Sequence, residues 1–310
     1  MAELGLQQAA LQSGLTFEVS EPKDDSGYVL ALTRFAESNY DLVIAVGLQT
    51  SPAVAEVARR FPSVHFALLD SYLYEGNPPR FVELPNVVSL IMSDQIAGYV
   101  LGIAAVEALK RKFGSVERGT VCTLGIQGRL LPSELAIAGF QDAVRTNAPK
   151  VRMIAAWDDY DAPGTPEDKG RIVGARHAEQ SCDVFFANAG NSGIGYIKAA
   201  AAAERIFVFM YPLNYILHDN FVLPGRRIEE APAGALAMGL RPLNAAVKAV
   251  AQDAAIGSFR SGVRPFAVTD LLTWGPAGSA LTSEAKAAAT TAINDIVTGR
   301  IQPKIDVIVR

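Results

Sequence analysis

The chain has few of the residues that most often carry catalysis or bind metal ions. Its 310 residues include only three histidines and two cysteines. His65, His177 and His218 are far apart and follow no metal-binding spacing, and His65 lies in an apolar run, where a core histidine is the usual explanation. Cys122 and Cys182 form no C-x-x-C motif, so we expect two inert buried thiols. The sequence predicts neither a metal site nor a cofactor.

A strong charge of one sign is also missing. The chain has 28 basic and 32 acidic residues and a net charge of -4, which leaves no electrostatic footprint for DNA, RNA or anionic lipid. We therefore expect no nucleic-acid partner. The longest apolar run, from Ile96 to Val106, ends at Glu107 and is shorter than the roughly 20 residues of a membrane span, so it predicts a buried helix. Residues 1–15 show neither the basic nor the apolar region of an export signal.

The motifs of common enzymes are absent as well. The sequence contains no G-x-S-x-G elbow and no P-loop, and it supports no Cys-His pair. Asp158 and Asp159 are adjacent, so they cannot both face one substrate from a regular strand. We predict that the chain is not an enzyme. A Rossmann-type enzyme is the main alternative from another class, and a ligand-sensing regulator is a third reading that no helix-turn-helix segment supports.

Apolar runs and amphipathic helices alternate along the chain. The helix predicted at 51–61 has Pro52 near its first turn, and the one at 283–300 begins at a Ser283 cap and stops at Gly299. The runs lack polar alternation, which is typical of parallel strands covered on both faces. The sequence predicts an α/β fold with parallel sheets. The predicted strands are 40–47, 64–70, 86–92, 120–126, 151–157, 183–189 and 205–211.

Two stretches repeat the same order of features. Residues 41–70 and 183–211 each run from an aspartate through an apolar strand, a glycine turn and a helix to a second apolar strand. In open α/β sheets, ligands bind beyond the carboxyl ends of the strands. Two lobes that face each other at those ends would enclose a cleft between Gly47 and Gly190. Chance similarity stays open as an alternative, because any βαβ unit has this pattern.

The second of these turns contains three glycines. Gly190, Gly193 and Gly195 follow the order G-x-x-G-x-G, which is not that of the dinucleotide fingerprint. Lys198 lies too far into the helix to complete a phosphate cradle. We interpret Gly190 as bare backbone that lets a ring or a sugar approach closely, with a structural turn and a phosphate site as the alternatives.

Several segments in the same order resemble a known family. YDLVIAVG, FPSVHFALLD, NVVSLIMSDQIAGYVLG, AIAGFQDAV and above all DVFFANAGNSGIGYIKAA are similar to the basic membrane protein (BMP) family of substrate-binding lipoproteins, the purine nucleoside receptor type that serves ABC importers. The similarity runs over nearly the whole chain. It implies a type I periplasmic-binding-protein fold, with two Rossmann-like lobes, parallel sheets and a ligand in the cleft between the lobes.

The resemblance also implies domain limits. Residues 1–94 and 239–264 would form the N-terminal lobe, and residues 95–238 the C-terminal lobe. Residues 265–310 would hold the third crossover and the last strand and helix, without an assigned lobe. The lobes would close about hinges near residues 94, 238 and 265.

The amino terminus departs from the family pattern. In the family, a first strand and an Asp-x-Ser-Phe-Asn type loop precede the residues that match 1–15. Absence of that strand would leave backbone edges unpaired in the first sheet. We hypothesise that this chain starts late, and that a signal peptide and an anchor cysteine lie upstream of Met1.

By resemblance, candidate ligand-binding residues lie at strand ends. Asp70 ends a predicted strand on the cleft side, with a helix cap as the alternative. Tyr160 aligns with a base-stacking Phe of the family, Trp157 is a second candidate for stacking, and nearby carboxylates such as Asp161 can accept hydrogen bonds from sugar hydroxyls or ring N–H groups. Core packing of Trp157 and a solvated acidic loop are the alternatives. The full set of candidates is Gly47, Asp70, Trp157, Tyr160, Asp161, Gly190, Tyr211 and Arg241.

Two departures bear on the identity of the ligand. Tyr211, with Asn214, stands where the family has carboxylates that hold ribose hydroxyls, and Arg241 stands where it has a lysine. A riboflavin or a free base therefore fits as well as a nucleoside. The resemblance implies the substrate-binding component of an ABC importer, which captures such a small molecule by domain closure and delivers it to a permease. It also implies export, with a lipid anchor to the cell membrane or a periplasmic location.

Overall fold

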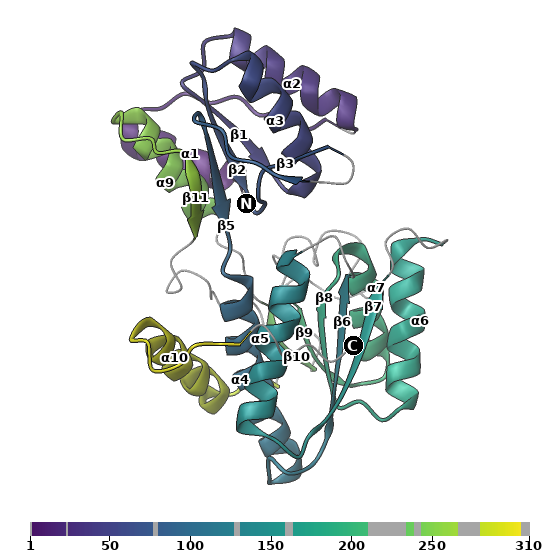
Figure 1. Cartoon of the computed structure of the whole chain (residues 1–310). Coiled ribbons are helices and arrows are strands. Elements are labelled where there is room, and N and C mark those ends of the chain that lie inside the picture. Colours follow the sequence, from purple (N-terminus) through teal and green to yellow (C-terminus); the bar gives the residue numbers. More distant parts are fainter. Residues whose placement is uncertain are drawn as a thin grey trace. The chain divides into compact units, whose positions relative to one another are not determined.

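The chain folds into two compact units (Figure 1). The computed structural model describes residues 2–22, 24–76, 80–126, 131–158, 164–209, 234–238, 243–265 and 280–304. Unit 1 comprises Met1–Met92 and Pro242–Asp270, and unit 2 comprises Ser93–Arg241 and Leu271–Arg310. Both units are built on parallel sheets flanked by helices, so the predicted α/β class is confirmed.

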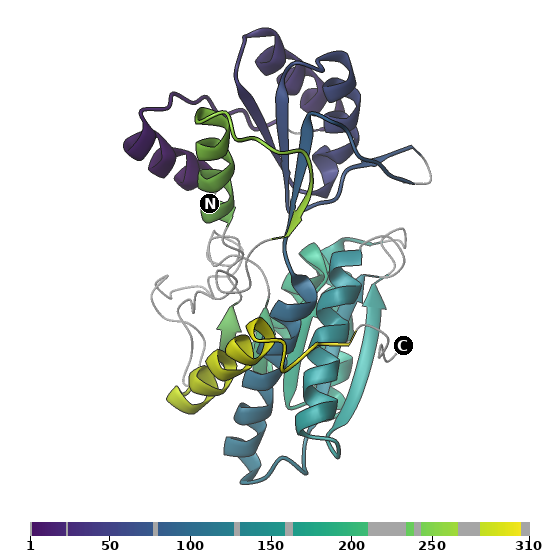
Figure 2. The same ribbon diagram turned by 60° about the vertical axis from the view of Figure 1, so that its left-hand side comes forward.

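Unit 1 has a four-stranded parallel sheet. In spatial order its strands are β1 (Leu42–Val46), β2 (His65–Leu69), β5 (Val87–Ile91) and β11 (Gly262–Pro265). One face is covered by α1 (Ala2–Ser13) and α9 (Leu243–Ala255), which lie side by side in Figure 2, and the other by α2 (Asp25–Glu37) and α3 (Ser51–Arg60). The shorter elements are η1 (Leu48–Thr50), β3 (Tyr74–Glu75) and β4 (Arg80–Phe81).

The apolar runs of unit 1 form strands because both faces of the sheet are covered. Successive side chains of a strand point to opposite faces. In β2, Phe66 and Leu68 join the core under α2 and α3, whereas Ala67 and Leu69 join the core under α9. A strand of this kind cannot alternate between apolar and polar residues, which is why the uninterrupted runs predicted it.

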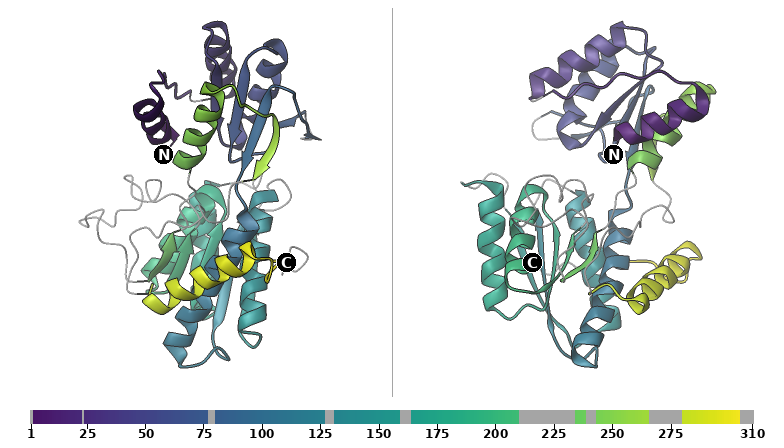
Figure 3. Two further views of the ribbon diagram at one scale, coloured as in Figure 1. Left: turned by 90° about the vertical axis from the view of Figure 1, so that its left-hand side faces the viewer. Right: turned by 180° about the vertical axis from the view of Figure 1, so that it is seen from behind.

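Unit 2 has a five-stranded parallel sheet (Figure 3). In spatial order its strands are β10 (Ala235–Met238), β9 (Ile206–Phe209), β8 (Val184–Asn188), β6 (Thr120–Ile126) and β7 (Arg152–Asp158). One face packs against α4 (Asp94–Phe113), α5 (Leu131–Asn147) and α10 (Ser283–Val297), the other against α6 (Pro166–Glu179) and α7 (Gly190–Ala202). Phe140 of α5 stacks on Phe186 of β8 with ring centroids 4.2 Å apart, and this pair lies in the core on the α5 side.

Glycines allow the helix pairs of unit 2 to approach closely. A Cβ added to Gly170 of α6 would fall on the carbonyl oxygen of Ser192 in α7, and one added to Gly195 of α7 would fall on that of Glu167 in α6. A Cβ added to Gly139 of α5 would likewise fall on the carbonyl oxygen of Gln95 in α4. The backbones of these helices therefore touch where a side chain would have separated them.

Helices α4 and α10 test two of the sequence predictions. The run from Ile96 to Val106 lies within α4 and is largely buried, as expected. Among the described residues, no helix combines the length and the apolarity needed to cross a membrane. The predicted Ser283 cap is wrong by one residue, because the Thr282 hydroxyl accepts the hydrogen bond from the Ala285 amide at 3.2 Å, and α10 ends at Val297.

The cysteines correct another expectation. Cys122 in β6 and Cys182, which lies two residues before β8, are joined by a disulfide, with their Cα atoms 6.0 Å apart. β6 and β8 are neighbours in the sheet, and the amide of Asp183 donates to the carbonyl of Thr120 at 2.8 Å. The pairing of two inert thiols could not be foreseen, because 60 residues separate the cysteines and only the strand register brings them together.

Candidate functional site

The carboxyl edge of the sheet in unit 1 places Gly47 next to Asp70. Gly47 follows β1 with φ 90°, and its amide donates to the carbonyl of Leu69 at 2.9 Å. Asp70 follows β2 with φ 61°, a left-handed conformation that few residues other than glycine, asparagine and aspartate adopt, and its amide donates to the carbonyl of Leu90 at 2.8 Å. No helix follows Asp70 directly, so the helix-cap alternative does not apply.

An aromatic group beyond Asp70 was not predicted from the sequence. Tyr72 lies edge-on to Phe81, with ring centroids 5.8 Å apart, and Tyr74 lies 6.3 Å from Tyr72. The buried Ser51 holds this segment against the start of α3, because its hydroxyl donates to the carbonyl of Tyr72 at 3.1 Å and accepts from the amide of Tyr74 at 2.7 Å. The signal was present in the stretch SYLYEGNPPRF after the predicted strand, where three aromatic side chains follow the acid.

The carboxyl edge of the sheet in unit 2 is held by a buried serine. The Ser133 hydroxyl in α5 accepts from the amide of Ile126, the last residue of β6, at 2.9 Å, and donates to the carbonyl of Asn188, the last residue of β8. The side-chain amide of Asn188 donates in turn to the carbonyl of Pro132 at 3.3 Å. These bonds fix the ends of two neighbouring strands to the start of α5.

Gly190 begins α7 at this same edge. Its φ of 52° favours glycine, and among the described atoms a Cβ added there would meet only the Ile126 Cδ1 atom, at 4.0 Å. The surroundings of Gly190 are therefore more open than those of Gly195, whose position is filled by another helix backbone. The geometry agrees with both the structural turn and the close-approach interpretation, so ligand contact at Gly190 stays a prediction.

Trp157 lies on a core face of the same unit. It pairs with Gly125 across β7 and β6, and its indole ring occupies the space that a side chain at Gly125 would need. The ring packs against the core that includes Ile137 of α5. Within the described part of the chain, the buried Nε1 atom of Trp157 has no hydrogen-bond partner. Core packing therefore explains the position of most of the Trp157 ring, and stacking of this ring on a ligand stays a prediction.

The carboxylate of Asp158, the next residue, is bound by two side chains of unit 2. The Ser192 hydroxyl of α7 donates to its Oδ2 atom, and the Lys169 Nζ atom of α6 lies 3.3 Å from its Oδ1 atom. The three side chains come from β7, α7 and α6, so this buried group fixes the carboxyl end of β7 to two helices. The other candidates, Tyr160, Asp161, Tyr211 and Arg241, lie outside the described residues.

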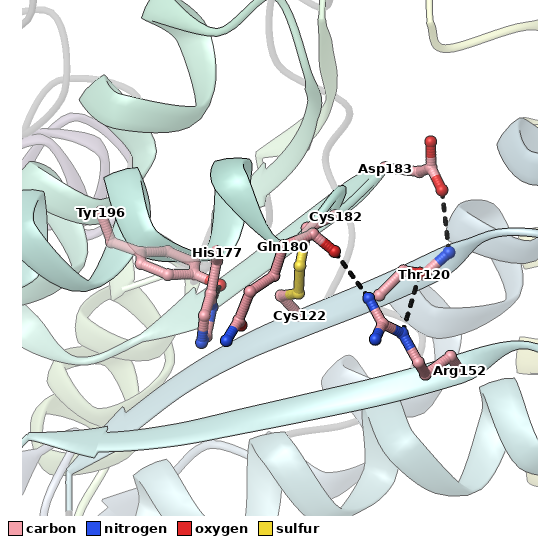
Figure 4. The surroundings of a disulfide bond; sticks show 8 residues. All are labelled: Thr120, Cys122, Arg152, His177, Gln180, Cys182, Asp183 and Tyr196. Atoms are coloured by element: carbon pink, nitrogen blue, oxygen red, sulfur yellow. Dashed lines mark hydrogen bonds between the residues drawn. A yellow bond between two sulfur atoms is a disulfide. The ribbon is translucent and has the colours of Figure 1, made fainter.

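His177 lies beside the disulfide, and together with the two cysteines it forms a group of side chains of the kind that ligates metal ions (Figure 4). The ligand atoms of Cys122, His177 and Cys182 lie within 4.8 Å of one another, and all three residues are buried. Burial lowers the pKa of His177 to about 4, and the Nδ1 atom of its ring lies 2.8 Å from the Tyr196 hydroxyl. Burial also raises the pKa of Tyr196 well above its usual value. Both sulfur atoms are used in the disulfide, so they cannot serve as thiolate ligands in this state.

The fold is that of the type I periplasmic binding proteins. A solute-binding protein of an ABC transporter system from Aeropyrum pernix has a similar structure, with a TM-score of 0.66 and 19% identity over 97% of this chain and 87% of that one. The structure of a transcriptional activator of the comK gene from Bacillus halodurans is also similar, with a TM-score of 0.72 and 15% identity over 98% of this chain and 95% of that one. Identities this low show the fold alone.

Sequence comparison gives the family. Residues 1–205 match the family Bmp, described as ABC transporter substrate-binding protein PnrA-like, and the chain belongs to this family. A CD4+ T-cell-stimulating antigen of Listeria monocytogenes is 25% identical over 182 residues, which are 58% of this chain and 45% of that protein. Basic membrane protein D of Borreliella burgdorferi is 22% identical over 185 residues, 59% and 49% of the two chains. The matched part thus spans about half the length of these relatives.

Proposed function

We propose that the chain is the solute-capture component of an ABC importer, and that it binds a nucleoside or a similar planar heteroaromatic compound such as a free base or a flavin. The observation that carries this proposal is the family match over residues 1–205, which includes the turns at Gly47 and Gly190. Solute-binding proteins of this family and fold are not enzymes, and we propose binding without turnover for this chain.

The carboxyl edges of the two sheets supply groups that suit such a ligand. Ligands of open α/β sheets bind at these edges. Asp70 offers a carboxylate that can accept hydrogen bonds from hydroxyl or ring N–H groups, and Gly190 offers backbone that a flat ring can approach. Contributions from Tyr160, Tyr211 and Arg241, and closure of the two lobes on the ligand, stay predictions.

Export to an oxidising compartment and delivery to a membrane permease complete the proposal. Stable disulfides are typical of exported proteins and rare in the reducing cytosol, and the Cys122–Cys182 disulfide supports export for this reason. Relatives named as lipoproteins from Pyrococcus furiosus and Pyrococcus horikoshii support a lipid anchor.

A thermal-shift panel tests the ligand class. The panel contains adenosine, guanosine, cytidine, the free bases adenine and guanine, and riboflavin, with D-ribose as the sugar without a flat ring. A ligand at 100 times its Kd stabilises the folded protein by about 2.7 kcal/mol, which gives a clear rise in Tm. We expect a rise with at least one flat-ring compound and none with ribose. No rise with any flat-ring compound would overturn the ligand class, and turnover of a nicotinamide substrate would favour a Rossmann-type enzyme.

A further inference from the structure

Cys122, His177 and Cys182 bring three metal-binding atoms together inside unit 2. We call these three residues the Cys2His group. Their ligand atoms lie within 4.8 Å of one another. An ion bound at about 2.3 Å to sulfur and about 2.0 Å to nitrogen keeps its ligand atoms within roughly 4.6 Å of one another. The three side chains therefore need only a small shift to hold one ion, once the sulfur atoms are no longer bonded to each other.

A tight turn sets the positions of His177 and Cys182. His177 lies near the end of α6, and the amide of Cys182 donates to the carbonyl of His177 at 3.1 Å. Between them, Ser181 adopts a left-handed conformation with φ 61°, and its amide donates to the carbonyl of Ala178 at 3.1 Å. The backbone of this turn therefore fixes two of the three ligand-bearing residues without help from the disulfide.

Hydrogen bonds also hold Cys122 beside this turn. The amide of Asp183 donates to the carbonyl of Thr120 at 2.8 Å, and the amide of Thr120 donates to the Asp183 Oδ2 atom at 2.8 Å. The guanidinium group of Arg152 donates to the carbonyl of Gln180 at 2.6 Å and to the Thr120 hydroxyl at 3.3 Å (Figure 4). These bonds join the start of β6 to the turn before β8. Opening of the disulfide therefore leaves the two sulfur atoms side by side.

The hydroxyl of Tyr196 orients the ring of His177. It lies 2.8 Å from the Nδ1 atom, and the two rings are in edge-on contact with centroids 5.6 Å apart. A metal-ligating histidine uses one ring nitrogen for the ion and donates a hydrogen bond from the other. When Nδ1–H donates to the Tyr196 oxygen, Nε2 keeps the lone pair that a metal ion needs.

The donor set favours a soft ion of low charge. Thiolates select Cu(I) and zinc, and imidazole binds both metals. Structural zinc sites almost always have four protein ligands, whereas the part of the chain that the structure describes offers three here. Cu(I) is satisfied by three ligands. The cysteines belong to the apolar core between β6, β8 and α7, which includes Phe185 and Ile197, and a monovalent ion is easier to bury there than a divalent one.

An exposed turn covers the group. Glu179, Gln180 and Ser181 are exposed, and the buried Cys182 follows directly. Turns of this kind open locally at a much smaller cost in free energy than the core. An ion therefore reaches the Cys2His group when this turn opens, without unfolding of the sheet.

We propose that the reduced form of unit 2 has a buried Cu(I) site, formed by the thiolates of Cys122 and Cys182 and the Nε2 atom of His177. A dithiol reductant transfers two electrons and two protons to the disulfide, which becomes two thiols, and the reductant is itself oxidised to a disulfide. Cu(I) then displaces both thiol protons. The disulfide and the metal site exclude each other. The proposal is independent of the solute that the protein captures.

Anaerobic titration of the whole chain tests the site. The chain is reduced with dithiothreitol, freed of the reductant and titrated with Cu(I) in competition with the coloured chelator bathocuproine disulfonate. We expect one equivalent of Cu(I) for each reduced chain and none for the oxidised chain. Equal uptake by both forms, no uptake by the reduced form, or tighter binding of zinc would overturn the proposal. Where reduction unfolds unit 2, Cu(I) should restore its circular dichroism, and failure to restore it would also overturn the proposal.

Two variants separate a built site from a simple pair of thiols. His177→Gln removes the nitrogen ligand and should weaken Cu(I) binding by about a hundredfold or more, whereas Tyr196→Phe keeps all three ligands and should weaken it by about tenfold. His65→Gln removes a histidine of unit 1, where it stacks on Phe259, and should leave the affinity unchanged. Tyr196→Phe keeps the test decisive where His177→Gln does not fold. Equal affinities of the wild type and both unit 2 variants would overturn the proposal.

X-ray absorption at the copper edge identifies the ligands directly. The reduced chain loaded with Cu(I) should show two sulfur neighbours and one nitrogen neighbour, and His177→Gln should lose the nitrogen neighbour. A copper environment of sulfur alone in the wild type would contradict the proposed site.

Discussion

In unit 2, strand β6 pairs with a strand on each side, whereas in unit 1, among the residues that the structure describes, β1 pairs with a strand on one side only. The same order of helix and strand recurs in both units, but a disulfide and close helix pairs fix unit 2. Unit 1 contains neither cysteine, and two cavities lie beside its strand β1. The two units therefore share an architecture but are held together by different interactions. Each variant described next changes one unit, and the other unit of the same protein serves as the internal reference.

Removal of the disulfide has the largest expected effect. The double variant Cys122→Ala and Cys182→Ala opens a loop closed across 60 residues, and the loop-entropy relation gives a loss of about 4 kcal/mol. Urea unfolding followed by hydrogen exchange should show this loss in unit 2, with unit 1 unchanged. Reductant should destabilise the wild type in the same unit and have no effect on the double variant. Equal stability of wild type and double variant would contradict a cross-link in unit 2.

Acid should also weaken unit 2 first. The pKa of buried His177 is lowered from 6.5 to about 4, so the unfolded chain takes up a proton at a higher pH than the folded chain does. The stability is therefore complete above pH 6.5 and decreases as the pH falls toward 4, by about 3 kcal/mol. His177→Gln should remove this part of the pH dependence. Unfolding free energies from pH 8 to pH 4 measure it, and equal slopes for wild type and variant would contradict it.

The close helix pair of unit 2 gives a smaller effect. Gly170→Ala places a methyl group on the Ser192 carbonyl, and overpacking of this kind costs about 2 kcal/mol. Helix propensity alone would make the same change favourable. Ile172→Ala, at an exposed position of α6, is the control and should cost less than Gly170→Ala. Thermal unfolding compares them, and a stabilised Gly170→Ala variant would show that α6 and α7 lie farther apart.

The smallest effect concerns the carboxyl edge of unit 1. Asp70→Asn keeps a residue that tolerates the left-handed conformation and removes the charge. We expect stability to change little and the affinity for the flat-ring ligand to fall about tenfold, or about 1.4 kcal/mol. Asp41→Asn makes the same charge change at the amino end of β1 and should leave affinity unaltered. Calorimetric titration of both variants decides this, and equal affinities would remove Asp70 from the site.

The sequence predicted those features that depend on local pattern. Runs such as YDLVIAVG became strands because burial on both faces requires uninterrupted apolar residues, and β1 lies inside that run. The disulfide and the packing of Trp157 on Gly125 could not be predicted, since both follow from strand register between distant segments. The position of Asp70 at a strand end was predicted correctly, but its left-handed backbone was not, because aspartate carries no such signal by itself.

Native mass spectrometry of the purified chain with equimolar guanosine and riboflavin tests most directly whether the protein binds a flat ring system and leaves it unchanged. We predict a one-to-one complex with at least one of the two compounds, and release of that compound with its original mass. The absence of a complex with either compound, or release of a compound of altered mass, would contradict solute capture.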